Sequence, residues 1–322
     1  MEERQKILRI SVRRLVEFLL RSGSLESRSG PSREAAMREG ARIHRQIQKK
    51  EGEGYRAEVP LKLEIPLTED SMPVLPVFTQ APSSGLFLCL EGRADGIFKK
   101  ISKRTFKKNG SDSDEDTDPG GSGKDIIVID EIKTVFRGLQ EMREPEEVHL
   151  AQARCYAYIY AVKEGLDRIG IRMTYSGQVT GEIRYFYEEQ SFEELSQWFI
   201  SLIREYGPWI KRKLSFEESA VRTIRAGKFP FHYREGQFDL AAGVYRTIVH
   251  GRKLFLQAPT GTGKTLAVLF PALKAVGEGK AEKIFYLTAK NVTGRVALES
   301  LRLLYERGLC IRSLELVSKE RS

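Results

Sequence analysis

The 322-residue chain lacks several features that would place it in a special class of protein. It has only three cysteines, Cys89, Cys155 and Cys310, which are far apart and odd in number. They match neither a metal-ligand spacing nor a disulfide framework, so we expect a reducing, cytoplasmic environment. No apolar run approaches the ~20 residues of a membrane helix, which excludes membrane association through a spanning helix. Arg9 and Arg13 interrupt the first apolar stretch, which excludes a signal peptide.

Acidic residues are outnumbered as well. Lys and Arg total 53 against 44 Asp and Glu, a net charge of +9. This excess favours an anionic partner such as nucleic acid. The length allows two domains, each able to bury a core, and no internal repeat is present.

The most specific motif is a phosphate-binding loop, "APTGTGKT", at residues 258–265. A short apolar strand at 254–256 is predicted before the loop, and a helix is predicted after it. The loop fits the Walker A pattern, except that Ala258 occupies the usual position of the first glycine. The glycines turn backbone N–H groups toward the β-phosphate, the lysine meets the β- and γ-phosphates, and Thr265 ligates Mg²⁺. The residues predicted to bind ATP here are Gly261, Thr262, Gly263, Lys264 and Thr265.

The chain lacks the second half of such a nucleotide site. No aspartate follows Asp239, and the one clear downstream strand, 284–287, ends without an acidic residue. Hydrolysis requires an acidic residue for Mg²⁺ and a group that orients water. We therefore expect an N-terminal piece of a longer protein, cut inside its nucleotide-binding domain, that binds ATP weakly and does not turn it over.

The residues before the loop alternate between predicted helices and strands, which indicates an α/β fold. Helices are predicted at 3–22, 33–50, 146–164 and 191–213, and strands at 55–65, 86–91, 93–101, 126–135, 170–176 and 182–188. Residues 103–124 include "NGSDSDEDTDPGGSG", which has almost nothing to bury. This segment is predicted to be a disordered hairpin insertion.

A second constellation lies in "GRADGIF" (92–98) and "IVIDEIKTV" (127–135). In a strand, Glu131 and Lys133 share a face, and Asp95 is placed on the preceding strand. Two carboxylates suit a hard cation, which would polarise a phosphodiester while Lys133 positions the attacking water. A structural ion pair is the alternative interpretation of the same residues.

Two helical pairs add to this pattern. Gly40 and His44 are one turn apart, and so are Gln152 and Tyr156. With "GRAD" and "EIK", they resemble the RecB-like branch of the PD-(D/E)XK nucleases. The resemblance implies a metal site with His44, Asp95 and Glu131 as ligands for Mg²⁺ or Mn²⁺. It also implies catalysis by Asp95, Glu131 and Lys133, with Gln152 and Tyr156 supporting the site or touching DNA.

The roles of two more residues near this pattern are left undecided. Glu58 would join the site, but its solvent-side position in the strand pattern explains it equally well. His149 shares a helix face with Gln152, and its function is left undecided.

The segment around the loop resembles DinG/XPD-like DNA helicases of superfamily 2. Arg234 and Gln237 in "YREGQ" occupy the position of a Q motif, whose amide reads adenine. "YLTAKNVTGR" is similar to a segment that grips the DNA backbone in that family. Several relatives hold an iron–sulfur cluster on four cysteines; Cys310 alone cannot bind one, so such a cluster would lie further downstream.

Together the resemblances imply a RecB-like nuclease domain at 1–213, a junction at 214–229 and the start of a RecA-like helicase motor at 230–322. The implied function is a helicase that unwinds duplex DNA with ATP and cuts the products with a divalent metal in DNA repair or processing. The implied partner is single-stranded or branched DNA. The alternative is a helicase whose nuclease-fold domain binds DNA without cleaving it. A kinase or transport ATPase is disfavoured by "YREGQ".

Overall fold

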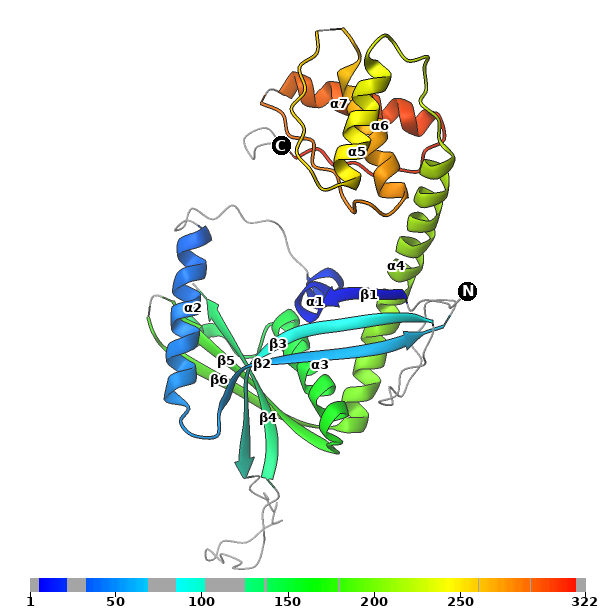
Figure 1. Ribbon diagram of the computed structural model, residues 1–322. Coiled ribbons are helices and arrows are strands. Elements are labelled where there is room, and N and C mark those ends of the chain that lie inside the picture. The colour runs from blue at the N-terminus through cyan, green and yellow to red at the C-terminus, as the bar shows by residue number, and fades with distance from the viewer. Residues whose placement is uncertain are drawn as a thin grey trace, which may run out of the picture. The chain divides into compact units, whose positions relative to one another are not determined.

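The computed structural model describes residues 6–21, 33–68, 85–101, 125–135, 138–178, 180–259, 261–289 and 291–316 (Figure 1). The chain divides into two compact units, Met1–Trp209 and Ile210–Ser322. The predicted hairpin insertion at 103–124 lies outside the described residues. None of the helices in the described parts of the chain has the length and apolar character of a membrane-spanning segment.

The first unit is built on a six-stranded mixed sheet. Its strands are β1 (Lys6–Ser11), β2 (Arg56–Leu67), β3 (Leu86–Ile101), β4 (Asp125–Val135), β5 (Arg168–Gly177) and β6 (Ile183–Ser191). The order is β1-β3-β4-β5-β6, and β2 pairs with β3. The pairs β1–β3 and β4–β5 are parallel, and the other pairs are antiparallel. The predicted α/β class is confirmed.

The long strand β3 creates a fork in this sheet. Its first half, from Leu86 to Glu91, pairs with β1, whereas its last residues, from Gly96 to Ile101, pair with β4. β2 pairs with β3 along both halves. Asp95 therefore lies where β3 and β4 begin to separate, a place at which a side chain can enter the gap between two strands.

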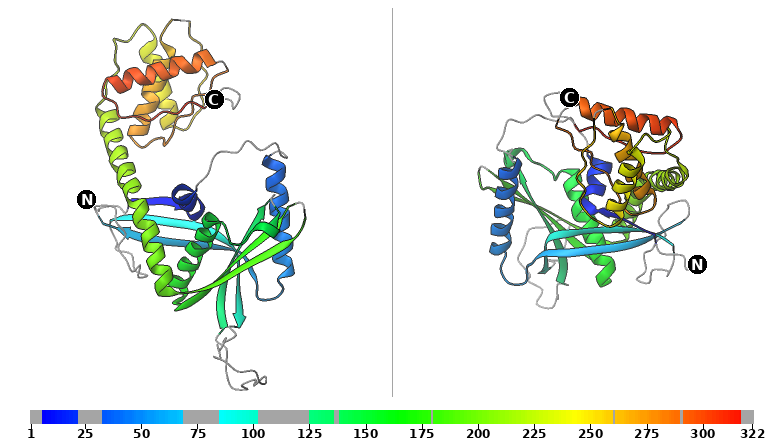
Figure 2. Two further views of the ribbon diagram at one scale, coloured as in Figure 1. Left: turned by 180° about the vertical axis from the view of Figure 1, so that it is seen from behind. Right: turned by 45° about the horizontal axis from the view of Figure 1, so that its top comes forward.

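Helices cover both faces of the sheet (Figures 1 and 2). α2 (Arg33–Lys50) packs Ile43 and Ile47 against Ile132 of β4. α3 (Glu147–Glu164) packs on β4 and β5 from the opposite face, and α1 (Val12–Leu20) packs on α3. Phe199 of α4 (Phe192–Ala226) stacks on Tyr158 of α3, with 3.9 Å between the ring centroids. β4 is thus a central strand, as its two apolar faces predict.

Two predicted boundaries in this unit are wrong. The helix predicted at 3–22 is instead strand β1 followed by helix α1, because residues 6–11 pair with β3. Ser11 ends the strand and caps the helix, its Oγ accepting the Arg14 N–H at 3.2 Å. The strands predicted separately at 86–91 and 93–101 form one continuous strand, β3.

The second unit has helices α5 (Gln237–Val249), α6 (Lys264–Gly277) and α7 (Asn291–Glu306). Its core also includes the last turns of α4, which runs to Ala226 rather than ending near 213. The buried members of this core are Ile224, Leu266, Phe270, Leu273, Leu304 and Leu309. Ile224 contributes directly to the core, which explains why the helix continues through the predicted junction.

The strands predicted at 254–256 and 284–287 are not formed. Phe255 is 94% exposed and Leu287 is 88% exposed, so both segments present apolar side chains to solvent. A strand exists only where another strand satisfies its backbone groups. Within the described part of this unit, neither segment has such a partner.

Candidate functional site

A buried polar cluster joins β4 to α3. Glu131 Oε1 accepts hydrogen bonds from Lys133 Nζ at 2.7 Å and from Gln152 Nε2 at 2.6 Å. Lys133 Nζ also lies 3.3 Å from Gln152 Oε1, and Gln152 is 3.4 Å from the Tyr156 hydroxyl. The strand period places Glu131 and Lys133 on the face that α3 covers, and the helix period places Gln152 and Tyr156 one above the other. The structure therefore brings these four predicted residues together.

The other two predicted residues meet at the fork. His44 Nδ1 of α2 lies 3.5 Å from Asp95 Oδ1 of β3. Asp95 Oδ2 accepts the backbone N–H of Ile132 at 2.7 Å, so the carboxylate bridges the gap between β3 and β4. Ile132 is the residue between Glu131 and Lys133. This bond holds Asp95 beside the Glu131 cluster and links both halves of the predicted site.

Gly92 is explained by close packing against Tyr156. A Cβ at Gly92 would lie 2.5 Å from the Tyr156 hydroxyl oxygen, a distance that side-chain atoms do not tolerate. The glycine of "GRAD" therefore makes room for the tyrosine of "AQARCY".

Burial dominates the electrostatics of Glu131, whose side chain is only 2% exposed. Burial raises the pKa of Glu131 to about 8; the Lys133 ammonium opposes this shift, and the nearby Asp95 carboxylate adds to it. Burial also raises the pKa of the Tyr156 hydroxyl, and the Glu131 charge raises it further. Both shifts favour the protonated form of the side chain, so the cluster disfavours negative charge that no cation balances.

One oxygen atom of Glu131 could serve as a ligand for a cation. Glu131 Oε2 is buried and accepts no hydrogen bond from the described residues. A buried acceptor without a donor is costly unless a ligand meets it. However, no three His, Cys, Asp or Glu side chains in the described ranges are grouped closely enough to hold a metal ion as they stand. Metal binding would require His44, Asp95 and Glu131 to converge and Lys133 to release Glu131.

The opposite face of β4 carries a network that the sequence analysis missed. Asp130 is fully buried and accepts hydrogen bonds from Arg172 at 2.8 Å and 3.1 Å, from Thr174 at 2.6 Å and from Tyr55 at 2.8 Å. Arg172 also pairs with Glu51 at 2.8 Å. Adjacent residues on a strand face opposite ways, so Asp130 anchors the strand while Glu131 enters the cluster. The one signal in the sequence was a charged residue between Val128 and Ile132, the apolar neighbours on its strand face.

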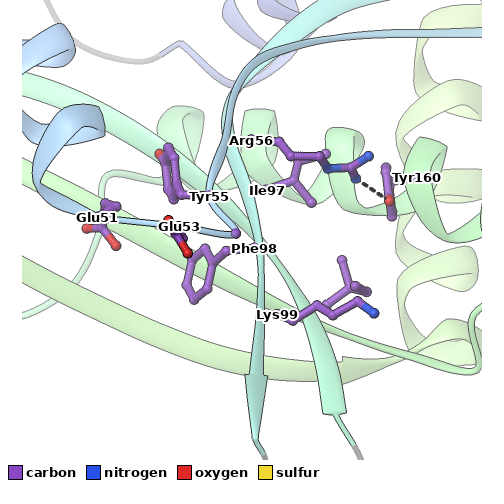
Figure 3. Close-up of a pocket in the computed structure, with 10 residues that line it drawn as sticks. Glu51, Glu53, Tyr55, Arg56, Ile97, Phe98, Lys99 and Tyr160 are labelled. Carbon is purple, nitrogen blue, oxygen red and sulfur yellow. Dashed lines mark hydrogen bonds between the residues drawn. The ribbon is translucent and has the colours of Figure 1, made fainter.

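A pocket of about 640 Å³ lies against this network and shares Glu51 and Tyr55 with it (Figure 3). Figure 3 shows Tyr55 beside Phe98, whose rings stack at 5.9 Å, and Arg56 reaching the hydroxyl of Tyr160. None of the predicted site residues lines it. The pocket is therefore distinct from the Glu131 cluster.

Glu58, left open by the sequence, has a strained backbone with a φ of +54°. Its carboxylate accepts a hydrogen bond from Gln48 at 3.1 Å and lies 3.4 Å from Arg93. Gln48 also donates to the Asp95 carbonyl at 3.0 Å. Glu58 is thus connected to the fork through Gln48.

The phosphate-binding loop of the second unit leads into α6, which begins at Lys264 as expected. Gly261 and Gly263 have φ values of +85° and +70°, which favour glycine. Lys264 Nζ donates to the carbonyls of Ala258 at 2.6 Å and Pro259 at 2.9 Å, so the lysine folds back over its own loop. Thr265 lies in the first turn of α6.

The two predicted adenine-reading residues contact this loop. Gln237 Nε2 donates to the carbonyls of Thr262 at 3.2 Å and Gly263 at 3.4 Å. Gln237 Oε1 accepts the Arg234 N–H at 3.0 Å, and the Arg234 guanidinium donates to the Gly261 carbonyl. The structure thus brings "YREGQ" and the phosphate-binding loop into one site.

Comparison with known proteins gives one family match. None of the curated proteins matches this chain. A solved structure titled "Crystal structure of SSO0001" covers 65% of this chain and 77% of its own chain at 15% identity and a TM-score of 0.34, which establishes no common fold. The family model of the DEAD/DEAH box helicases matches residues 240–305. This match spans most of the second unit, including the phosphate-binding loop and α6. Residues 240–305 therefore carry a helicase-type domain, which supports an ATP-dependent function on nucleic acid.

Proposed function

We propose that the chain combines a DinG/XPD-like helicase motor with a RecB-like, metal-dependent DNA nuclease. One observation carries the nuclease half of the proposal. Four elements that are far apart in sequence, α2, β3, β4 and α3, direct polar side chains to one fork in the sheet. These side chains are His44, Asp95, Glu131, Lys133, Gln152 and Tyr156.

Each residue has a distinct role in this proposal. His44, Asp95 and Glu131 would hold Mg²⁺ or Mn²⁺, since imidazole and carboxylate oxygens suit these ions. The bound ion would polarise a phosphodiester and acidify a water. Lys133 orients the attacking water, while Gln152 holds Glu131 and Tyr156 supports Gln152. In the second unit, Lys264 and Thr265 meet the phosphates and Mg²⁺ of ATP, and Gln237 reads the base.

The direct test is cleavage of single-stranded and flapped DNA in Mg²⁺ and in Mn²⁺. Wild-type chain is expected to cut, and Glu131→Gln is expected to lose cleavage with the fold retained. Glu144→Gln, at an exposed position, is the matched control and should cut like wild type. Metal affinity is measured alongside by calorimetry.

The second candidate function is a DNA-binding module that does not cut. The observation that favours it is the closed pair of Glu131 and Lys133, without a three-ligand group in the described residues. Wild-type chain that binds DNA but cuts it in neither metal, with Glu131→Gln binding the ions equally well, establishes this candidate instead.

A further inference from the structure

A row of polar side chains extends the Glu131 cluster across the sheet. Lys133 of β4 is in register with Tyr175 of β5, which is in register with Arg184 of β6. Paired residues of neighbouring strands project to the same face, so all three lie on the face that α3 covers. Tyr175 is fully buried between the two cations. The row continues the proposed active site away from Glu131.

His149 of α3 lies over this row. Its Nδ1 is 3.1 Å from the Tyr175 hydroxyl and 3.4 Å from Glu146 Oε2. The Tyr175 oxygen accepts the backbone N–H of Glu146 at 3.0 Å. The Tyr175 hydroxyl can donate to Nδ1 of a neutral His149 whose ring proton is on Nε2. In the imidazolium form, Nδ1–H faces the Glu146 carboxylate instead.

The position of His149 relative to the cluster follows from helix geometry. His149 precedes Gln152 by three residues on α3, so the two side chains are neighbours on one face. Gln152 Oε1 is 3.3 Å from Lys133 Nζ. The side chains of His149 and Lys133 are 24% and 19% exposed, whereas Glu131 is 2% exposed. A phosphate that reaches Lys133 from solvent therefore comes within reach of the imidazole.

We propose that His149 is the proton donor to the leaving oxygen of the phosphodiester, with Tyr175 and Glu146 as its positioning residues. This inference rests on the proposed nuclease function. Water oxygen forms the new bond to phosphorus and loses a proton to solvent water. The bond from phosphorus to the leaving sugar oxygen breaks, and that oxygen takes the Nε2 proton of the imidazolium. The ring is then neutral with its proton on Nδ1, which faces the Glu146 carboxylate, and Nε2 takes a new proton from solvent water before the next turnover.

A proton donor at the leaving oxygen suits a site that holds one ion. In nucleases with two ions, the second ion stabilises the leaving oxygen. The predicted ligands His44, Asp95 and Glu131 suffice for one ion, so the charge on the leaving oxygen needs a proton. Glu146, the N-cap residue of α3, and Tyr175 of β5 lie beside the His149 ring, and Lys133 of β4 and Arg184 of β6 flank Tyr175 in the same row.

The test replaces the leaving oxygen by sulfur. Single-stranded DNA carries one bridging 3′- or 5′-phosphorothiolate at the cleaved linkage, and cleavage is followed under single-turnover conditions. A thiolate leaves without protonation, so the loss of a general acid should not lower the cleavage rate of this substrate. His149→Ala and His149→Gln are expected to cut normal DNA about 10²–10⁴-fold more slowly than wild type. On whichever substrate has sulfur in the leaving position, both variants should come within a few-fold of wild type.

The controls separate this role from a structural one. His250→Ala, at an exposed position of the second unit, should cut both substrates like wild type. Calorimetric Mn²⁺ affinity and DNA binding of His149→Gln should equal those of wild type. Normal cleavage of unmodified DNA by both His149 variants, or an equal slowing on normal DNA and on both sulfur substrates, overturns the inference alone. Absence of cleavage by wild type overturns the proposed function, and this inference with it.

Discussion

The Lys133 ammonium lies 2.7 Å from Glu131 Oε1, on the same strand and two residues further along. We expect this pair to decide how the proposed site responds to a metal ion. When Glu131 is ionised, its buried carboxylate needs a positive partner, and Lys133 supplies one. A divalent cation at Glu131 would compete for the same oxygen atoms and release Lys133 toward the substrate.

Removing Lys133 should therefore separate metal binding from cleavage. In Lys133→Ala, Mn²⁺ affinity is expected to stay equal or increase, because a competing cation is gone. Cleavage is expected to slow by about 10²-fold or more, because the group that we propose to orient the attacking water is lost. Lys163→Ala, exposed on the last turn of α3, is the matched control. Weaker Mn²⁺ binding with unchanged cleavage would show that Lys133 is a structural partner of Glu131.

The buried carboxylate of Glu131 should make stability depend on pH. Its folded-state pKa of about 8 lies above the ordinary value of 4.5, so the folded protein binds a proton that the unfolded chain releases. This contribution is complete below pH about 4.5 and is lost as pH rises to about 8. In EDTA, the free energy of unfolding of the first unit should fall over this window, and Glu131→Gln should flatten the slope.

Tryptophan fluorescence can follow this unit alone. The chain has two tryptophans, Trp198 and Trp209, and both belong to Met1–Trp209. Urea unfolding at several pH values between 5 and 8.5 gives the slope for each variant. Glu144→Gln, at an exposed position, should keep the wild-type slope. Identical slopes for wild type and Glu131→Gln would rule out Glu131 as the source.

The hydrogen bonds to the buried Asp130 carboxylate should contribute strongly to the stability of the first unit. Arg172→Met removes two hydrogen bonds to a fully buried carboxylate and leaves that charge without a cation. We expect a loss of about 3–5 kcal/mol in the free energy of unfolding. Tyr55→Phe removes one hydrogen bond to the same carboxylate and should cost about 1–2 kcal/mol. Urea unfolding measures both; equal costs would mean that Arg172 does not neutralise Asp130.

Local periodicity explains why some of this architecture was predictable from the sequence. Glu131 and Lys133 share a strand face, and Gln152 and Tyr156 share a helix face, whatever the rest of the fold is. The α/β class and helix 33–50 followed from the same periods. Pairing of distant segments has no such local signal. Tyr55 and Arg172 meet Asp130 from two other strand regions, and only the complete sheet shows it.

The same limit explains the errors at both ends of the chain. Residues 6–11 have a helical stripe in sequence, but pairing with β3 makes them a strand. Residues 254–256 and 284–287 have the composition of strands, yet no described segment pairs with them. Strand formation depends on a partner that the segment's own residues do not specify.

The last prediction concerns the contact between Gln237 and the phosphate-binding loop. A Cβ at Gly263 would lie 2.6 Å from Gln237 Nε2, so Gly263→Ala must displace the glutamine or the loop. It also strains the backbone, because Gly263 has a φ of +70°. Gly279 offers a matched control, since its φ is +73° and a Cβ there meets nothing within 4 Å.

Both alanine variants should lose about 1–2 kcal/mol of local stability from the left-handed backbone. Only Gly263→Ala should also weaken binding of a fluorescent ATP analogue, as should Lys264→Ala, which removes the cation for the phosphates. If Gln237 reads the base, Gln237→Ala should weaken ATP more than GTP. If Gly279→Ala weakens the nucleotide as much as Gly263→Ala does, backbone strain accounts for the loss, and the Gln237 contact has no part in nucleotide binding.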